Sequence, residues 1–237
     1  MSRLTNDRIC DEGWPVLAMA GAVTILISFV ALPVGCFLLG VMMWLAHILR
    51  VPQRLPPSCE NLVVAPVDGR VVQIKHCLAE TGDIPLSYNA LRITIRTKLS
   101  DTQMQTSPIT GHLIDNCLFP GLFEPWTNID HSNTDRHQDC WEDVRRLNER
   151  REITLRHAQG HEVVMVQLAT KTARQLVCRL AEGKHLVVAD PIGMARLAGV
   201  TDIYVPATST TDIAIGQHVV ASETVLARLP SSVTAGK

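Results

Sequence analysis

Residues 14–48, WPVLAMAGAVTILISFVALPVGCFLLGVMMWLAHI, contain no aspartate, glutamate, lysine or arginine, and their one histidine is His47. About 20 apolar residues are enough to cross the hydrocarbon core of a bilayer. A run of this length is therefore not typical of a core helix in a small soluble domain. It predicts that the chain is anchored to a membrane and that the rest of it lies beside lipid headgroups.

Pro33 divides this run into residues 16–32 and 34–48, and proline favours a bend because it cannot continue the helical hydrogen bonds. Two arrangements remain open: a helical hairpin with both ends on the same side, or one kinked span. A cleaved signal peptide fits poorly, because the apolar run is too long. Basic residues on both flanks favour the hairpin with both ends in the cytoplasm: Arg3, Arg8, Arg50 and Arg54.

The composition excludes several classes of protein. The net charge is −1 and no basic stripe with interleaved aromatic residues occurs, so nucleic acid is not a predicted partner. The seven cysteines are odd in number and form no CxxC pair, which predicts free thiols in a reducing compartment rather than a disulfide framework or a zinc site.

The chain divides into an N-terminal tail (1–12), the membrane anchor (13–49), a proline-rich linker (50–62), one domain (63–229) and a C-terminal tail (230–237). We expect a helix over 170–180, and a polar loop that runs into a helix over 124–150. The fold class is α+β, mainly β: a compact β domain behind a bent helical anchor. Short β-type runs are predicted at 62–65, 70–74, 91–96, 152–156, 163–168, 203–205, 219–221 and 223–229.

In their order and spacing, short motifs along nearly the whole chain resemble those of the phosphatidylserine decarboxylases, in the short bacterial membrane-bound form. The resemblance implies a β-rich domain, a phospholipid substrate and a role in phosphatidylethanolamine synthesis. It also implies a pyruvoyl group made from the chain itself, with no external cofactor. The motifs are Gly13-Trp14-Pro15, the basic and proline-rich residues 48–57, Ala65-Pro66-Val67-Asp68-Gly69, Asn148-Glu149-Arg150, MVQLA at 165–169 followed by Ala173-Arg174, IGMAR at 192–196, and GQHVVASETV at 216–225.

The resemblance breaks at the position on which the family's chemistry depends. Family members carry a Gly-Ser pair there; the serine attacks the preceding carbonyl, and the cleaved chain keeps a pyruvoyl group that forms a Schiff base with the substrate amine. Here Leu197, Ala198, Gly199 and Val200 align with the family's F-G-S-R. Gly199 replaces the serine and has no hydroxyl, so we expect no cleavage between Ala198 and Gly199. Thr201 is the nearest hydroxyl and the alternative cleavage site.

A second departure concerns proton transfer. Gln103 stands where the family has a histidine, and Gln105 where it has an asparagine. Glutamine cannot exchange a proton near neutral pH, so general acid–base catalysis is lost at this position. Asp68 alone of the family's Asp, His and Ser remains. An aspartate before a glycine is also favourable in a turn, so its presence alone says little about activity.

No metal site is predicted. His157 and His161 are four residues apart, but Gly160 and the β-type runs around them place both at the tip of a hairpin, where we expect surface histidines. A polar loop could hold a divalent cation, although such loops are usually only solvated; its candidate ligands are Asp130, His131, Asp135, His137 and Asp139.

The sequence thus predicts a lipid-binding or regulatory pseudoenzyme at the inner (plasma) membrane, with its domain on the cytoplasmic side. Its partners would be phosphatidylserine or phosphatidylethanolamine, and a second copy of itself or an active relative. Two alternatives stay open: an active phosphatidylserine decarboxylase, a lyase that matures at Thr201, and a purely structural membrane scaffold.

Overall fold

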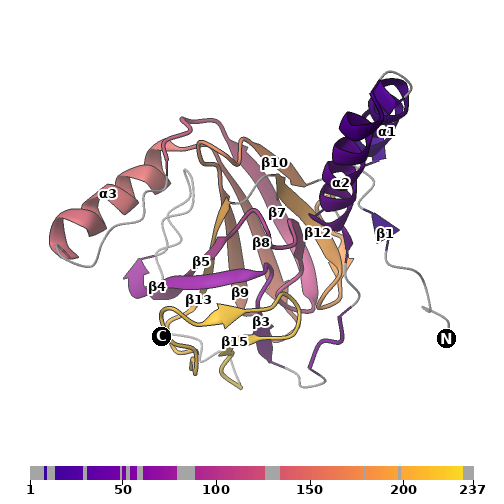
Figure 1. The fold of residues 1–237 in the computed structure, drawn as a ribbon. Coiled ribbons are helices and arrows are strands. Elements are labelled where there is room, and N and C mark those ends of the chain that lie inside the picture. Colours follow the sequence, from indigo (N-terminus) through magenta and orange to yellow (C-terminus); the bar gives the residue numbers. More distant parts are fainter. Residues whose placement is uncertain are drawn as a thin grey trace, which may run out of the picture.

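The structure is a computed structural model that describes residues 8–9, 14–28, 31–48, 50–51, 54–57, 61–78, 89–125, 134–178, 180–196 and 199–231. A curled antiparallel sheet forms the body of the domain, the first two helices project from one side, and α3 (Thr134–Leu147) lies on the opposite side (Figure 1). The predicted mainly β class is confirmed.

The main sheet has eight strands in the order β11-β7-β8-β9-β13-β5-β4-β14. Smaller antiparallel sheets join β10, β12 and β6, then β15 and β3, and finally β1 and β2. The bounds are β1 Arg8–Ile9, β2 Arg50–Val51, β3 Leu62–Val64, β4 Gly69–Leu78, β5 Asn89–Thr97, β6 Met104–Thr106, β7 Gly111–Phe119, β8 Arg150–His157, β9 Glu162–Leu168, β10 Gln175–Cys178, β11 His185–Leu186, β12 Pro191–Arg196, β13 Gly199–Pro206, β14 His218–Val219 and β15 Val225–Arg228.

The hydrophobic core lies inside the curl of the sheet. Alternate residues of each strand point inward, so Ile93 and Ile95 of β5 face Ile153 of β8 and Ile203 of β13 within one cluster of fully buried side chains. This alternation is the pattern from which the strand at 91–96 was predicted, and that prediction is confirmed.

The apolar run forms two helices that pack against each other, α1 (Trp14–Ser28) and α2 (Leu32–Ile48). The break precedes Leu32, and Pro33 lies in the first turn of α2, where its missing N–H has no helical partner to lose. The predicted bend at Pro33 is therefore displaced by a few residues, and the arrangement is the hairpin rather than the kinked span. A β-carbon on Gly35 would lie 2.1 Å from Ser28 Oγ, so the helices approach closely there.

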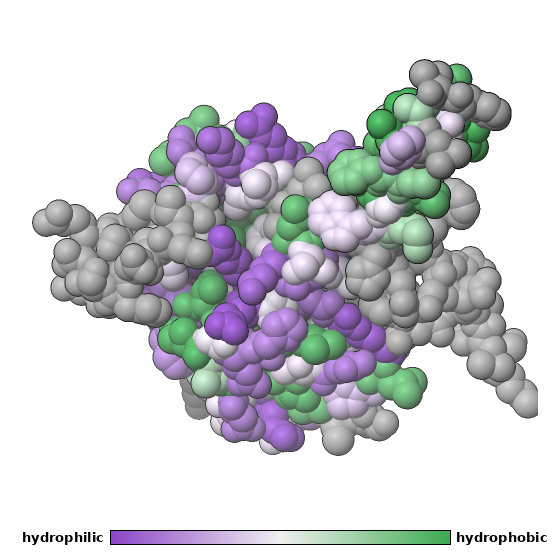
Figure 2. Space-filling view, in the orientation of Figure 1, coloured by the Kyte–Doolittle hydropathy of each residue, from purple (hydrophilic) through white to green (hydrophobic). Residues whose placement is uncertain are grey.

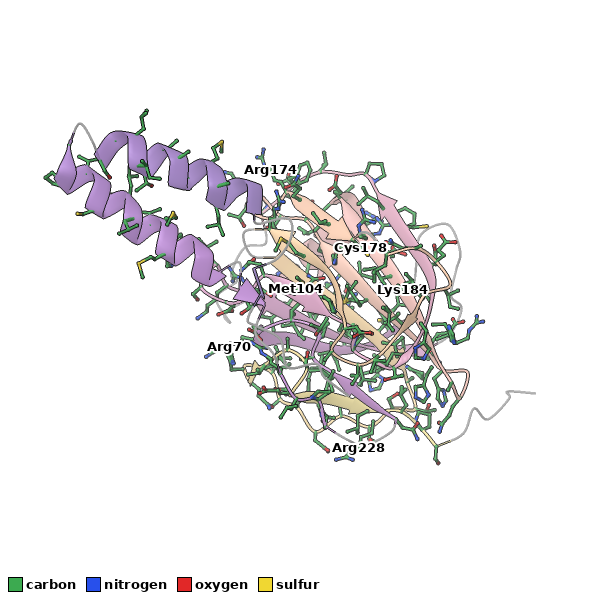
Figure 3. All side chains as sticks on the ribbon, turned by 90° about the vertical axis from the view of Figure 1, so that its right-hand side faces the viewer. Arg70, Met104, Arg174, Cys178, Lys184 and Arg228 are labelled. Atoms are coloured by element: carbon green, nitrogen blue, oxygen red, sulfur yellow. The ribbon has the colours of Figure 1, made fainter. Side chains whose placement is uncertain are left out.

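Figures 2 and 3 show the hairpin projecting from the domain with mainly apolar side chains on its surface. Phe37 and Leu26 are 72% and 73% exposed. Within the part of the chain that the structure describes, no single helix is both long enough and apolar enough to cross a membrane.

One predicted helix is wrong. Residues 170–180 contain β10, whose Leu176 pairs with Ala195 of β12, and a turn in which Thr170 N–H donates to the carbonyl of Ala173. Ala173 and Leu176 are buried, as helical spacing suggested, but a turn followed by a short strand buries the same positions. The helix predicted at the end of the polar stretch is confirmed as α3 (Thr134–Leu147).

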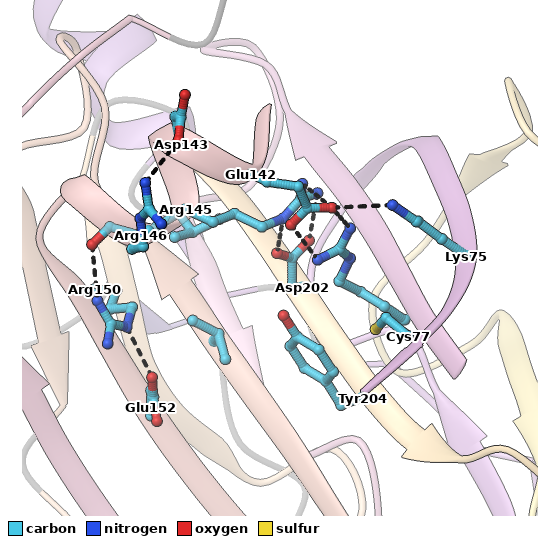
Figure 4. A pocket seen from close by; sticks show the side chains of 13 residues that line it. Lys75, Cys77, Glu142, Asp143, Arg145, Arg146, Arg150, Glu152, Asp202 and Tyr204 are labelled. Atoms are coloured by element: carbon cyan, nitrogen blue, oxygen red, sulfur yellow. Dashed lines mark hydrogen bonds and ion pairs between the residues drawn. The ribbon is translucent and has the colours of Figure 1, made fainter. Parts of the chain in front are cut away.

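An ionic network attaches α3 to the outer face of the sheet (Figure 4). Arg145 of α3 donates from Nε to Asp202 Oδ2 at 2.6 Å and from Nη2 to Thr94 Oγ1 at 2.9 Å. Glu142 of α3 binds Arg92 of β5 through two hydrogen bonds, one of them 2.9 Å long. Since Arg145 and Asp202 are both buried, each needs the other as a counter-charge.

We therefore expect Arg145→Ala to lower the free energy of unfolding by about 3–5 kcal/mol, because it leaves the Asp202 carboxylate buried without its partner. The matched control is Arg146→Ala, the next residue, which is 77% exposed and pairs with Asp143 on the surface. The control should change stability by less than about 1 kcal/mol. Urea unfolding of both variants is the measurement, and equal losses would contradict this role for Arg145.

Candidate functional site

Three positions identified in the sequence meet around Thr97 and Lys98, at the end of β5. The Thr97 hydroxyl donates a 2.8 Å hydrogen bond to the backbone carbonyl of Asp68. On the neighbouring strand, Gly199 is the direct antiparallel partner of Thr97. The side-chain amide of Gln103 donates to the carbonyl of Lys98 at 3.1 Å. The fold therefore brings Asp68, Gln103 and Gly199 to one place.

Asp68 lies in a buried turn before β4, and its carboxylate is fully engaged. Arg54 binds both of its oxygens, with Nη2 2.6 Å from Oδ2, and the N–H of Ala221 donates to Oδ1 at 2.8 Å. Burial by itself would raise the pKa of Asp68, but the hydrogen bonds from Arg54 and Ala221 and the guanidinium charge outweigh it, so the pKa lies below the usual value. A carboxylate held ionised in this way is a poor proton acceptor.

Gln103 is buried, and its side-chain amide forms hydrogen bonds with the nearby backbone. Its Nε2 donates to the carbonyl of Lys98 and, at 2.7 Å, to the carbonyl of Asp101. Both bonds hold the turn between β5 and β6, which carries Lys98 and Leu99. The glutamine thus acts here as a positioning residue for the turn.

A cavity of about 380 Å³, which we call the Gly199 pocket, lies beside the aligned cleavage position. It is lined by three segments, 96–99, 170–172 and 199–200, together with Pro125. A β-carbon on Gly199 would lie 3.4 Å from the Ala195 β-carbon and 3.6 Å from that of Ala173, so a small side chain fits with little adjustment. The other partner of the aligned bond, Ala198, lies outside the described residues.

Thr201, the alternative cleavage site, is the third residue of β13 and is buried. It pairs with Ile95 on one side and Gln167 on the other, and its hydroxyl accepts a 3.3 Å hydrogen bond from Gln105 Nε2. Gln167 in turn donates to Gln105 Oε1. The hydroxyl of Thr201 therefore belongs to a polar cluster within the domain and does not line the Gly199 pocket.

A second cavity, of about 590 Å³, lies between α3 and the outer face of the sheet (Figure 4). Its charged residues are those of the ionic network, Lys75 at 3.5 Å from Glu142, and two further pairs, Arg146 with Asp143 and Arg150 with Glu152. Burial raises the pKa of the Cys77 thiol and of the Tyr204 hydroxyl at its floor, so both are neutral near pH 7. Because each of its cations forms an ion pair with a carboxylate, we attribute this cavity to the attachment of α3.

The described residues contain no group of three or more His, Cys, Asp or Glu side chains that could hold a metal ion. His157 and His161 flank the predicted hairpin turn, which is confirmed between β8 and β9 with Gly160 at a φ of 85°. The expectation that both are surface residues is wrong for His161, which is buried with Nε2 3.0 Å from the carbonyl oxygen of Pro230. Asp130 and His131, and the side chains of Asp135, His137 and Asp139, lie outside the described residues.

The sequence matches the family profile described as phosphatidylserine decarboxylase over residues 42–227. The chain belongs to the phosphatidylserine decarboxylase family. It is 30% identical to the phosphatidylserine decarboxylase proenzyme of Polynucleobacter asymbioticus, over 94% of this chain and 95% of the relative. The corresponding proenzyme of Geobacter sulfurreducens is 30% identical over 96% and 100%, and that of Burkholderia mallei 32% over 94% and 95%.

The family acts on the membrane phospholipid phosphatidylserine and uses a pyruvoyl group derived from its own chain rather than an external cofactor. The motifs on which the resemblance was recognised therefore identify the family correctly. That Asp68, Gln103 and Gly199 occupy the positions of the family's catalytic set stays a prediction from the sequence motifs.

Sequence reasoning missed Arg54, Thr97 and Lys171. Arg54 was identified only as a basic residue flanking the apolar run and as part of the motif at 48–57; its contact with Asp68 arises only through the fold. Thr97 and Lys171 belong to segments that are distant in sequence. They line the same pocket because β5 pairs with β13 and the turn after β9 lies beside them. Only the pairing of the strands could have revealed them.

The lowered pKa of Asp68 predicts a specific pH dependence of stability. A carboxyl whose pKa is depressed by folding stabilises the native state above its unfolded pKa of about 3.9, and this contribution is lost as the pH falls through the folded pKa. Arg54→Gln leaves burial unopposed by the guanidinium, so the pKa of Asp68 rises. We expect this variant to lose about 2–4 kcal/mol of stability at neutral pH.

The difference between the wild type and Arg54→Gln should shrink in acid, because the protonated carboxyl no longer needs the cation. Urea unfolding at several pH values measures it. Arg228→Gln is the control, since Arg228 is exposed and only 3.8 Å from its partner Asp212. A difference that does not depend on pH would mean that Arg54 stabilises the protein by packing alone.

Proposed function

We propose that this chain is a membrane-associated member of the phosphatidylserine decarboxylase family that stays uncleaved and binds a phospholipid headgroup without decarboxylating it. The observation that carries the proposal is Gly199, at the position of the family's pyruvoyl-forming serine and beside a cavity of headgroup size.

The residues present here do not fit the family's pyruvoyl group. Formation of the pyruvoyl group starts when a side-chain oxygen attacks the preceding carbonyl, and Gly199 has no side chain. Two nearby threonine hydroxyls are engaged in other hydrogen bonds and do not replace the missing serine oxygen. The Thr97 hydroxyl donates to the carbonyl of Asp68, and Thr170 Oγ1 accepts from the N–H of Ala173.

The proton-transfer positions support the same proposal. Gln103 offers an amide that does not titrate, and its Nε2 donates to two backbone carbonyls. Asp68 is ionised and bound to Arg54. Neither side chain is available as a general acid or base near neutral pH.

The alternative, an active decarboxylase that matures at Thr201, is disfavoured by the position of that residue. Attack by Thr201 on the carbonyl of Val200 would break β13 between its second and third residues, where Val200, Thr201 and Asp202 are all paired with strands on both sides. The hydroxyl would also have to leave Gln105.

The exposed surface of α1 and α2 supports the membrane part of the proposal. Large apolar side chains lie on the surface of both helices, and soluble monomers rarely expose such a continuous apolar area. Because the two helices form a hairpin, both of its ends lie on one side. We place the domain on the cytoplasmic side of the inner membrane, beside its phospholipids. The regulatory form of this proposal adds a second copy or an active relative as partner.

The test of the proposal is intact mass spectrometry of the purified full-length protein, combined with a decarboxylation assay on phosphatidylserine vesicles. We expect one unbroken chain and no release of carbon dioxide. Two fragments, one with a blocked ketoacyl end, together with product formation, would overturn the proposal. A scaffold without a ligand predicts the same unbroken chain but no binding of headgroup analogues.

Restoring the missing groups tests whether the rest of the site is intact. The space at Gly199 admits a serine, so we expect Gly199→Ser combined with Gln103→His to fold and to convert a measurable fraction of the protein into two fragments. The matched control, Gly199→Ala with Gln103→His, adds the β-carbon without the oxygen and should stay whole. If the folded serine variant also stays whole, the scaffold has lost more than these two groups.

A further inference from the structure

The described lining of the Gly199 pocket is positively charged. Among the residues that the structure describes, three cationic side chains line it, Arg96, Lys98 and Lys171, and no aspartate or glutamate does. Across the described residues, no ion pair joins any of the three to a carboxylate. This distinguishes the pocket from the cavity under α3, where the cations are paired.

Two carboxylates near the pocket, Asp68 and Asp101, are engaged elsewhere. Asp68 is bound by Arg54 and the N–H of Ala221. Asp101 accepts from the backbone N–H of Lys98 and from Ser100 Oγ. An ammonium group in the pocket would therefore meet three cations, and none of the described lining residues is a carboxylate that could bind it.

The remaining lining suits a phosphorylated headgroup. The Thr172 side chain is exposed on the rim and can donate to a phosphate oxygen, as can the cations. Leu99 and Pro125 are exposed apolar residues at the same pocket. The pocket lies where β12 leads into β13, and Figures 1 and 3 show the hairpin on the side of the domain that carries β12. A lipid beside the hairpin can therefore present its headgroup here.

We infer that the Gly199 pocket selects phospholipid headgroups by negative charge, binding anionic headgroups in general and rejecting the zwitterionic phosphoethanolamine. The inference rests on the proposed function and names the ligand class for its pocket. A headgroup of phosphate alone, phosphoglycerol and phosphoserine each carry net negative charge. Phosphoethanolamine carries none, and its ammonium group would be repelled by the cations. Recognition by an amine-reactive ketone is thus replaced by recognition of charge.

The test uses the full-length protein in neutral detergent micelles, titrated with short-chain lipids at low ionic strength. We expect phosphatidic acid to bind most tightly, followed by phosphatidylglycerol and phosphatidylserine, with phosphatidylethanolamine at least about tenfold weaker; a tenfold ratio corresponds to about 1.4 kcal/mol. The preference should weaken as salt is added, because the cations lie at an open pocket. Equal affinities for phosphatidylglycerol and phosphatidylethanolamine would overturn the inference.

Inorganic phosphate is the arm that separates a lipid headgroup from free phosphate. We expect it to bind at least about tenfold more weakly than short-chain phosphatidic acid, because it makes no contact with the apolar rim. Equal affinity of the two would assign the pocket to a soluble phosphate and would overturn the headgroup assignment.

Variants locate the binding. Lys171→Gln and Arg96→Gln should each weaken binding of phosphatidylglycerol about fivefold while leaving phosphatidylethanolamine unchanged. The matched control is Lys184→Gln, an exposed lysine outside both cavities, which should change neither. Thermal unfolding verifies that Arg96→Gln is folded, and Lys171 lies on a surface turn where substitution leaves the strands intact. Unchanged binding in both variants would contradict this site.

These outcomes are separable from those of the proposed function. A protein that cleaves itself and releases carbon dioxide refutes the proposed function, whatever its charge preference. A protein that stays whole, and binds headgroups without regard to charge, refutes only the present inference.

Discussion

The ion pair between Arg54 and Asp68 is the interaction on which the arrangement of the site depends. It joins the linker that follows the helical hairpin to the turn that begins β4, and Arg54 also donates to the carbonyl of Ala221. Three segments far apart in sequence are thereby held around two opposite charges that are both largely removed from water. Because either charge alone would be costly to bury, the pair fixes where the hairpin leaves the domain relative to the Gly199 pocket.

The sequence predicted the elements whose pattern is local. Residues 91–96 alternate between apolar and polar side chains, and they form part of β5. The polar stretch ending near Leu147 leads into α3 as expected. The predicted helix at 170–180 failed because Ala173 and Leu176 are buried by a turn and a short strand that pairs with β12, a contact with a distant segment. The hairpin break moved from Pro33 because proline is well accommodated in the first helical turn.

The candidate site shows the same division. Asp68, Gln103 and Gly199 could be found from short motifs, and their convergence on Thr97 and Lys98 follows from the pairing of β5 with β13. The interactions that Asp68 and Gln103 form could not be predicted. Gln103 holds a turn by donating to two backbone carbonyls, and the negative charge of Asp68 is compensated by Arg54 of the linker. The cations of the pocket, which form no ion pair within the described part of the chain, come from segments that no local pattern connects.

The absence of a side-chain oxygen at Gly199 has a consequence for how the protein behaves once it is unfolded. On the proposed function, β12 and β13 remain parts of one covalent chain, whereas a relative that has cut itself there consists of two polypeptides. Recovery of the native state is then a first-order event for this protein, independent of how dilute it is. A severed relative must find its missing half by diffusion, and that search slows as the concentration falls. The loss of the serine oxygen would thus leave a single chain that can refold repeatedly after unfolding, whereas a cleaved relative must first reassemble its two polypeptides.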